Sequence, residues 1–209
     1  MAVHGENYWK GYKKLPTAAT VLDTGIAMTT GGQPIVKEMR TSEEGGGQYM
    51  TYLRANSFYF ATGGTANKAF GQKLLTFPKG FISVKMCRIR CVSQTAASTS
   101  ATAGEMGLGT VIGSGANATI GAVGATSENF MEGQTISNHV ASTDLTSQLI
   151  AHGVGYGTAG AAQTSAYDGS ETAAPLYFNI ASAWTGTGNV TISNLKIWVE
   201  WSFFGEAAG

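Results

Sequence analysis

The residues of this chain that could carry chemistry are few, and their spacing fits none of the common catalytic or metal-binding motifs. The three histidines, His4, His139 and His152, are not spaced with cysteines or carboxylates as zinc ligands are. Asp144 and His152 could complete a hydrolase triad with one of many serines, but no strand–turn–helix nucleophile elbow surrounds any serine. We therefore expect no enzymatic activity, no metal and no cofactor.

Glycine-rich stretches at 107–109, 113–115 and 121–124 have the composition of phosphate-binding loops. No Gly-Lys-Ser/Thr follows them and no helix is predicted there, so neither a lysine nor a helix dipole would support the backbone donors. We interpret these glycines as turns and bulges. The carboxylate pairs at 43–44 and at Glu128 and Glu132 are placed in solvated loops, without an acid–base role.

The only two cysteines, Cys87 and Cys91, lie four residues apart on a predicted strand. They share a face about 13 Å apart, which is too far for a disulfide between them. We expect free buried thiols, as in a protein made in a reducing cytoplasm. No run of apolar residues approaches the roughly 20 that cross a membrane, and no secretion signal is seen at the first residues.

Charge is sparse and unevenly distributed along the chain. Charged residues make up 12% of the sequence, hydrophobic residues 43%, and the formal net charge is zero. Residues 1–90 contain twelve of the thirteen Lys and Arg, whereas residues 91–209 contain eight of the thirteen Asp and Glu. The two parts could neutralise each other inside one fold or complement each other within or between subunits. A chain with so few charges is weakly protected against association, so we expect an oligomer. Because the basic residues are scattered along the sequence rather than clustered, we expect no nucleic-acid partner.

Short alternating segments separated by turn residues predict a β protein. The predicted 81–94 strand contains a bulge that switches its faces, and Met86 points the same way as Ile82 and Val84. In the last strand, alternate residues from Leu195 to Phe203 form an apolar row. Two further aromatics lie on the opposite face, so we expect part of this strand to be covered on both faces. Segment 68–76 is either a helix or extended, and a short helix is predicted from Ser142 through 145–150. The predicted strands are 49–54, 57–61, 81–94, 105–112, 118–123, 134–140, 176–181 and 190–204, and the predicted loops are 152–157 and 163–172.

Many short strands with turns and no alternating helices predict an all-β fold, a jelly-roll-like sandwich of about eight antiparallel strands. We place this domain at residues 47–209 and an extended N-terminal arm at residues 1–46. Uncharged strand edges would be protected by burial in an oligomer.

Aromatic residues near both ends are the candidate partner-binding residues. Tyr8, Trp9, Tyr12 and Lys13 of the arm could stack on bases or anchor on a partner surface, and we favour the partner. At the other end, Trp201 and Phe203 are predicted to be core, whereas Trp198 and Phe204 are predicted to make a subunit contact.

Residues 175–201 read PLYFNIASAWTGTGNVTISNLKIWVEW. This segment resembles the C-terminal strand pair of structural proteins from tailed bacteriophages, in which a Pro-Leu-Tyr-type strand, a Gly-Thr-Gly turn and a Thr- and Val/Ile-rich strand ending in aromatics recur. The resemblance implies a virion component of the jelly-roll type, either a capsid decoration (cement) protein or a fibre or spike head.

The leading hypothesis is a homotrimeric decoration protein on the capsid exterior that binds the major capsid protein and stabilises the capsid by multivalent contacts. A fibre or receptor-binding module would instead bind host glycan through loops near Tyr156 and Tyr167. A shell-forming coat protein would assemble into closed particles alone, and a serine hydrolase would react with a covalent serine probe.

Overall fold

The computed structural model describes residues 36–45, 48–61, 67–95, 99–136, 148–153, 166–169, 171–186 and 189–204. Two short helical segments, α3 (Ile120–Val123) and η1 (Ala125–Ser127), lie between the sixth and seventh strands. The strands are β1 (Val36–Gly45), β2 (Gln48–Ala55), β3 (Phe58–Ala61), β4 (Lys68–Thr76), β5 (Phe81–Thr95), β6 (Thr99–Gly109), β7 (Met131–Ile136), β8 (Gln148–Gly153), β9 (Ala166–Asp168), β10 (Pro175–Gly186) and β11 (Asn189–Phe203).

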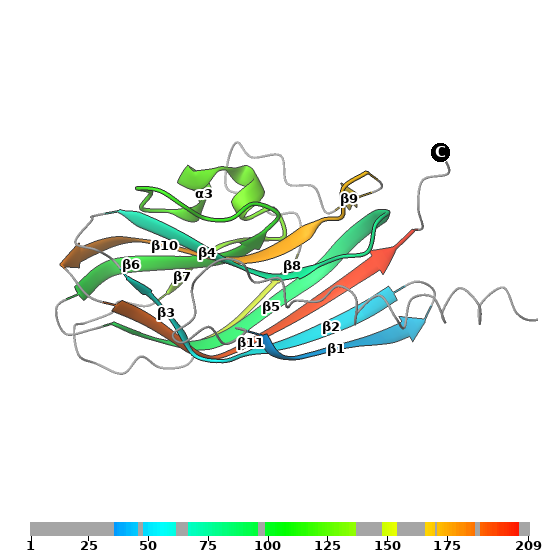
Figure 1. Cartoon of the computed structure of the whole chain (residues 1–209), viewed down its shortest axis with the longest axis horizontal. Coiled ribbons are helices and arrows are strands. Elements are labelled where there is room, and N and C mark those ends of the chain that lie inside the picture. The colour runs from blue at the N-terminus through cyan, green and yellow to red at the C-terminus, as the bar shows by residue number, and fades with distance from the viewer. Residues whose placement is uncertain are drawn as a thin grey trace, which may run out of the picture.

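The strands form two antiparallel sheets that face each other (Figure 1). Sheet A has the order β1-β2-β11-β5-β8, with β3 beside β11 and β9 beside β5, and sheet B has the order β4-β10-β6-β7. Eight of these strands form pairs in which the earliest strand in the sequence pairs with the latest, and so on toward the middle of the sequence: β2 with β11, β4 with β10, β5 with β8, and β6 with β7. A ribbon paired in this way and wound across two sheets is a jelly roll, as the sequence predicts. Strand β1 extends sheet A, so residues 36–45 of the predicted arm are an edge strand; residues 1–35 lie outside the described residues.

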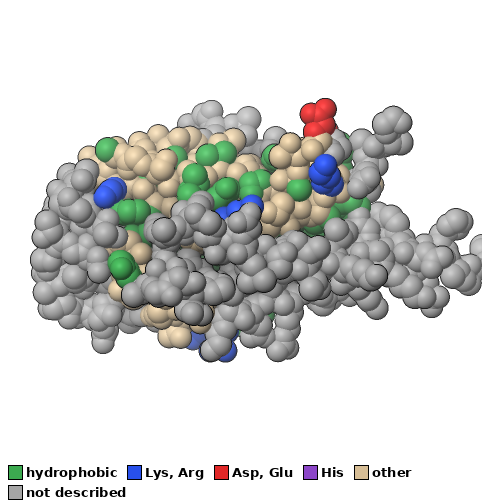
Figure 2. All heavy atoms as spheres, in the orientation of Figure 1, with side chains coloured by type: hydrophobic (Ala, Val, Ile, Leu, Met, Phe, Trp, Pro, Cys, Tyr) green, Lys and Arg blue, Asp and Glu red, His purple; other side chains and the backbone are tan. Residues whose placement is uncertain are grey.

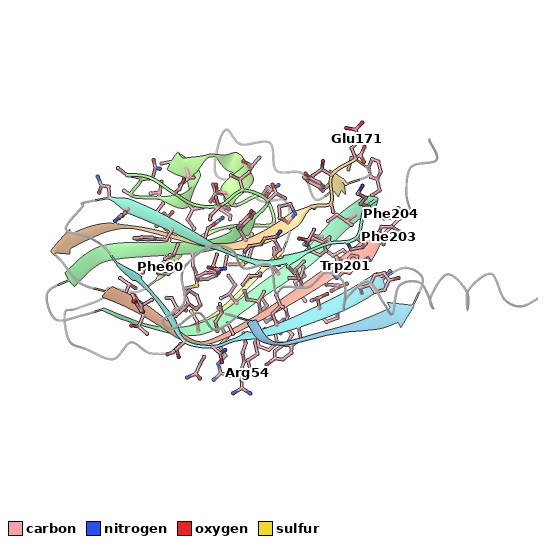
Figure 3. All side chains as sticks on the ribbon, in the orientation of Figure 1. Arg54, Phe60, Glu171, Trp201, Phe203 and Phe204 are labelled. Atoms are coloured by element: carbon pink, nitrogen blue, oxygen red, sulfur yellow. The ribbon has the colours of Figure 1, made fainter. Side chains whose placement is uncertain are left out.

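The core fills the space between the sheets, where Phe60 and Trp201 lie (Figure 3). Leu195, Ile197, Val199, Trp201 and Phe203 are all buried, which confirms the predicted apolar row of β11. Val190 and Ile192 are buried too, although they have the opposite parity. The pairing with β5 shifts between Ser193 and Lys196, and Asn194 has a positive φ of 52°, so a bulge there returns the second apolar run to the core.

Strand β5 contains the predicted bulge, but Met86 is not where the alternation places it. Val84 pairs with Trp201 and Met86 with Glu200, which leaves Lys85 as the extra residue. The bulge therefore directs Ile82 and Val84 before it, and Cys87, Ile89 and Cys91 after it, into one core. Met86 lies on the other face and is half-buried.

The connection from β6 to β7 folds back over the outer face of sheet B, on the side away from sheet A (Figure 1). We call residues 110–130 the cap. Asn179, fully buried in β10, accepts a hydrogen bond from the Gly113 amide at 2.7 Å and donates to the carbonyls of Val111 and Ser127 at 2.9 and 2.7 Å. This one side chain ties both ends of the cap to the middle of sheet B.

The structure differs from four local expectations. Residues 118–123, predicted as a strand, contain α3, which Thr119 caps by accepting a hydrogen bond from the Ala122 amide. Residues 148–150, predicted as helical, belong to β8 because Leu149 and Ile150 pair with Arg90 and Ile89 of β5. His152 lies in the same strand rather than in a loop, and short β9 interrupts the predicted 163–172 loop. Segment 68–76, left open between helix and strand, is β4.

The resemblance segment 175–201 also differs from a simple strand pair. Its two strands, β10 and β11, lie in different sheets, and in the described residues they pair with other strands rather than with each other. The two strands therefore do not form a hairpin.

Candidate functional site

The outer face of sheet A has a distinctive composition among the described residues. The cap lies on sheet B, and no described helix or strand lies over the outer face of sheet A (Figure 1). Arg54 extends from that face away from the sandwich (Figure 3), and basic side chains are visible along the same margin in Figure 2. We call this surface the platform. It consists of Met50, Tyr52, Arg54, Met86, Arg88, Arg90, Lys196, Trp198 and Glu200, all of them half-buried or exposed.

Strand register places the platform residues in three rows across β2, β11 and β5. The first row is Arg54, Lys196 and Arg90. The second row is Tyr52, Trp198 and Arg88, and the third is Met50, Glu200 and Met86. Because adjacent strands are about 4.8 Å apart, each row is a set of direct neighbours.

The middle row holds the aromatic centre of the platform. The Tyr52 and Trp198 rings pack with centroids 5.3 Å apart and planes inclined at 45°. Trp198 is half-buried by these neighbours, so its ring is fixed in place and still reachable. The sequence predicts that part of this strand is covered on both faces, whereas no described helix or strand lies over its outer face (Figure 1).

Phe204, the second predicted contact residue, lies apart from the platform. It is 69% exposed at the end of β11, where its amide donates to the Phe81 carbonyl at 2.9 Å. Phe204 lies at one end of the sandwich (Figure 3), and Phe81, which accepts this bond, is itself 40% exposed. Trp198 and Phe204 are six residues apart along one strand, roughly 20 Å, and the structure does not bring them into one site.

The structure also locates other residues considered in the sequence. Tyr8, Trp9, Tyr12 and Lys13 lie outside the described residues, as do Asp144 and Tyr156. Tyr167 is half-buried in β9 and packs against the hydrophobic core. Trp201 is core, as predicted: it stacks on Tyr49 at 4.6 Å, and its indole nitrogen donates to the Thr51 hydroxyl at 2.8 Å.

Both cysteines are free and buried in the core, as predicted. Burial raises the pKa of the Cys91 thiol to about 12 and raises that of Cys87 as well. The Cys91 thiol lies 3.8 Å from the Met106 sulfur. Neither thiol is ionised at neutral pH, so neither has the reactivity of a catalytic cysteine.

A carboxylate cluster lies where the cap meets β6 and β7. Glu128 is only 3% exposed, which corrects its placement in a solvated loop. It accepts a hydrogen bond from the Gly133 amide at 2.8 Å, and Glu105 accepts one from the Ile120 amide at 3.0 Å. Burial, and then repulsion by Glu132 and Glu105, raise the pKa of Glu128 against the lowering effect of the Gly133 amide. Across the described ranges, no three His, Cys, Asp or Glu side chains are grouped so that they could hold a metal ion.

Reasoning from the sequence found Trp198 but missed its neighbours. Tyr52, Arg54, Arg88, Arg90 and Lys196 occupy outward positions of strands whose alternation is readable, so each could be assigned to a surface. Their grouping depends on the order β2-β11-β5, which joins residues almost 150 positions apart in the sequence. Four of the thirteen Lys and Arg residues therefore become neighbours on this face only in the folded protein.

The helices in the described ranges are all too short or too polar to span a membrane. Comparison of the chain with protein-family models, with curated proteins and with solved structures gives no match.

Proposed function

We propose that this protein is a virion structural protein that decorates and stabilises the outer surface of a tailed-bacteriophage capsid through protein–protein contacts. The resemblance of residues 175–201 to phage structural proteins supports this proposal. The jelly-roll topology supports it as well, because this architecture recurs in viral capsid and lectin domains. Fold alone does not specify function, so the composition of the exposed surface carries the proposal.

The observation that carries it is the platform. Seven of its nine residues are Trp, Tyr, Met or Arg, the types enriched at protein–protein interfaces. Its central pair, Tyr52 and Trp198, is of the kind that dominates binding energy when a partner excludes water around it. This composition is suited to docking on a protein surface.

The protein would act as a homotrimer, with each copy contributing one platform and one N-terminal segment. Tyr8, Trp9, Tyr12 and Lys13 would be the anchors of that segment on the major capsid protein or a neighbouring subunit. Several weak contacts held on one particle add to a strong attachment, because each later contact forms at a high effective concentration.

Co-sedimentation with undecorated capsids tests the proposal. The wild-type trimer should pellet with capsids, and Trp198→Ala should lower the bound fraction. Tyr52→Ala should do the same, whereas the matched variant Tyr59→Ala should not. Tyr59 is an exposed tyrosine on β3 that pairs with Thr191, seven residues before Trp198 in β11.

A second pair of variants separates the N-terminal segment from the fold. Deletion of residues 1–35 keeps β1 in sheet A and should leave the thermal transition unchanged while reducing capsid binding. Light scattering of the wild-type protein alone measures the mass of its assemblies and so distinguishes a small oligomer from a closed shell. Closed particles formed without capsids would identify a shell-forming coat, and an oligomer that never pellets with capsids would refute decoration.

A further inference from the structure

The first platform row has a property that the fold does not require. Arg54, Lys196 and Arg90 are direct neighbours on three adjacent strands. Like charges placed opposite each other destabilise a sheet. Arg54 and Arg90 are exposed, and Glu38 of β1 stands in register with Arg54, so the row consists of three cations with one carboxylate residue at its β1 end. An occupant carrying negative charge would remove this repulsion.

Arg88 adds a second, independent feature. It is half-buried beside Trp198 in the middle row, and its Nε is enclosed without a hydrogen-bond partner in the described structure. The enclosed Nε is out of reach of a partner, so only the terminal nitrogens of this half-buried guanidinium can meet one, and a carboxylate is the acceptor that such a pair of nitrogens binds in a two-pronged geometry. Arg88 therefore points to a carboxylate at the border between the cationic row and the aromatic pair.

The third row distinguishes an acidic protein from a nucleic acid. Glu200 lies between Met50 and Met86, so one side of the platform is apolar with a carboxylate at its centre. Phosphates on that side would be repelled, whereas methionines pack readily against apolar side chains. The zero net charge of the chain also disfavours a nucleic-acid surface.

From these three rows we infer that the platform binds an acidic segment of a partner protein. Carboxylates of the segment pair with Arg54, Lys196, Arg90 and Arg88, and its apolar side chains pack on Trp198 and the two methionines. The inference rests on the proposed docking function and names the partner's chemistry: on a capsid, the receiving surface is acidic.

Fluorescence anisotropy with a labelled decaglutamate peptide tests the partner chemistry without capsids. The peptide should bind the full chain, with affinity falling as NaCl is raised, because exposed ion pairs are screened by salt. Arg54→Gln/Arg90→Gln should weaken binding by at least about threefold. The matched variant Lys73→Gln/Lys79→Gln removes the same charge from sheet B and from the turn before β5, and should bind as the wild type does.

Arg88→Lys keeps the charge and removes the forked geometry, so it should also weaken binding while the thermal transition stays unchanged. Tighter binding of an oligothymidylate of equal length, lost in Arg54→Gln/Arg90→Gln, would overturn the inference in favour of nucleic acid. Failure of decaglutamate to bind, together with oligomers that dissociate in that same variant, would overturn it in favour of a second copy of this chain.

The capsid assay separates the inference from the proposed function. Peptide binding by the platform without capsid association would uphold the acidic partner and refute decoration. Capsid association that is unchanged in Arg54→Gln/Arg90→Gln and insensitive to salt, with no peptide binding, would uphold decoration and refute the acidic partner.

Discussion

Replacement of Asn179 by alanine should detach the cap from sheet B and cost the protein a large part of its stability. The Asn179 side chain makes three hydrogen bonds at 2.7–2.9 Å, one to the amide of Gly113 and two to the carbonyls of Val111 and Ser127. A buried polar group left without a partner costs about 1–3 kcal/mol. Because the freed cap can open and admit water, we take the lower end for each group and expect a loss of about 3 kcal/mol.

That loss is large against the roughly 5–15 kcal/mol by which most domains are stable. Urea denaturation followed by tryptophan fluorescence measures it as a lower midpoint. The matched control is Asn117→Ala, which removes one exposed side-chain bond to the Ser114 carbonyl and should change the stability by less than about 0.5 kcal/mol.

Hydrogen exchange adds a local measurement. The Gly113 amide should be protected in the wild type by its bond to Asn179 and should exchange much faster in Asn179→Ala. A stability loss below about 1 kcal/mol, with Gly113 still protected, would refute the reasoning. It would mean that the packing of the cap, rather than this side chain, keeps it on the sheet.

Three further predictions concern buried groups. The pKa of Glu128 is raised in the folded state, so the stabilising contribution of the protonated Glu128 is complete below the ordinary pKa of 4.5 and is lost as pH rises through the raised pKa. Glu128→Gln should therefore raise the melting temperature at pH 7 but not at pH 4. The control Glu171→Gln, at an exposed position, should change the melting temperature at neither pH. The Cys87 and Cys91 thiols should react with a maleimide only as fast as the core opens, and labelling as rapid as that of a free thiol would contradict their burial. Gln72 is fully buried, and its Oε1 has no hydrogen-bond partner. Gln72→Met should therefore raise the free energy of unfolding, measured by urea denaturation, by about 1 kcal/mol. A lower free energy of unfolding would show that the hydrogen bond from Gln72 to the Lys73 carbonyl stabilises the fold by more than the unpartnered Oε1 destabilises it.

The alternation of apolar residues was sufficient to predict the sandwich and the long strands. It worked best in β11, where the buried row from Leu195 to Phe203 agrees with the pattern. It was misleading where partners far along the chain decide the conformation. Leu149 and Ile150 suit a helix locally, but the open edge of β5 holds them in β8. Met86 follows the pattern of its neighbours until the bulge at Lys85 turns it outward.

The candidate site was less predictable than the fold. Trp198 stood out as an aromatic on the polar side of an apolar strand. Its cationic neighbours did not, because Arg54, Arg90 and Lys196 belong to three segments that only the jelly-roll strand order makes adjacent. Glu128 was misplaced for a related reason: its burial depends on the cap folding back over sheet B, which no local pattern indicates.

The position of β11 has a consequence for how the protein is made. This strand is the last of those described, yet it lies in the middle of sheet A and separates β2 from β5. Until residue 203 has left the ribosome, β2 and β5 have no common neighbour, and their apolar faces stay exposed. The inner pairs, β6 with β7 and β5 with β8, can form earlier, but sheet A is completed only when β11 joins segments almost 150 positions apart, and such late long-range pairing is slow and invites aggregation. A translating ribosome would therefore carry sheet A incomplete until the end of its synthesis, which makes the domain a natural client for chaperones that hold nascent chains.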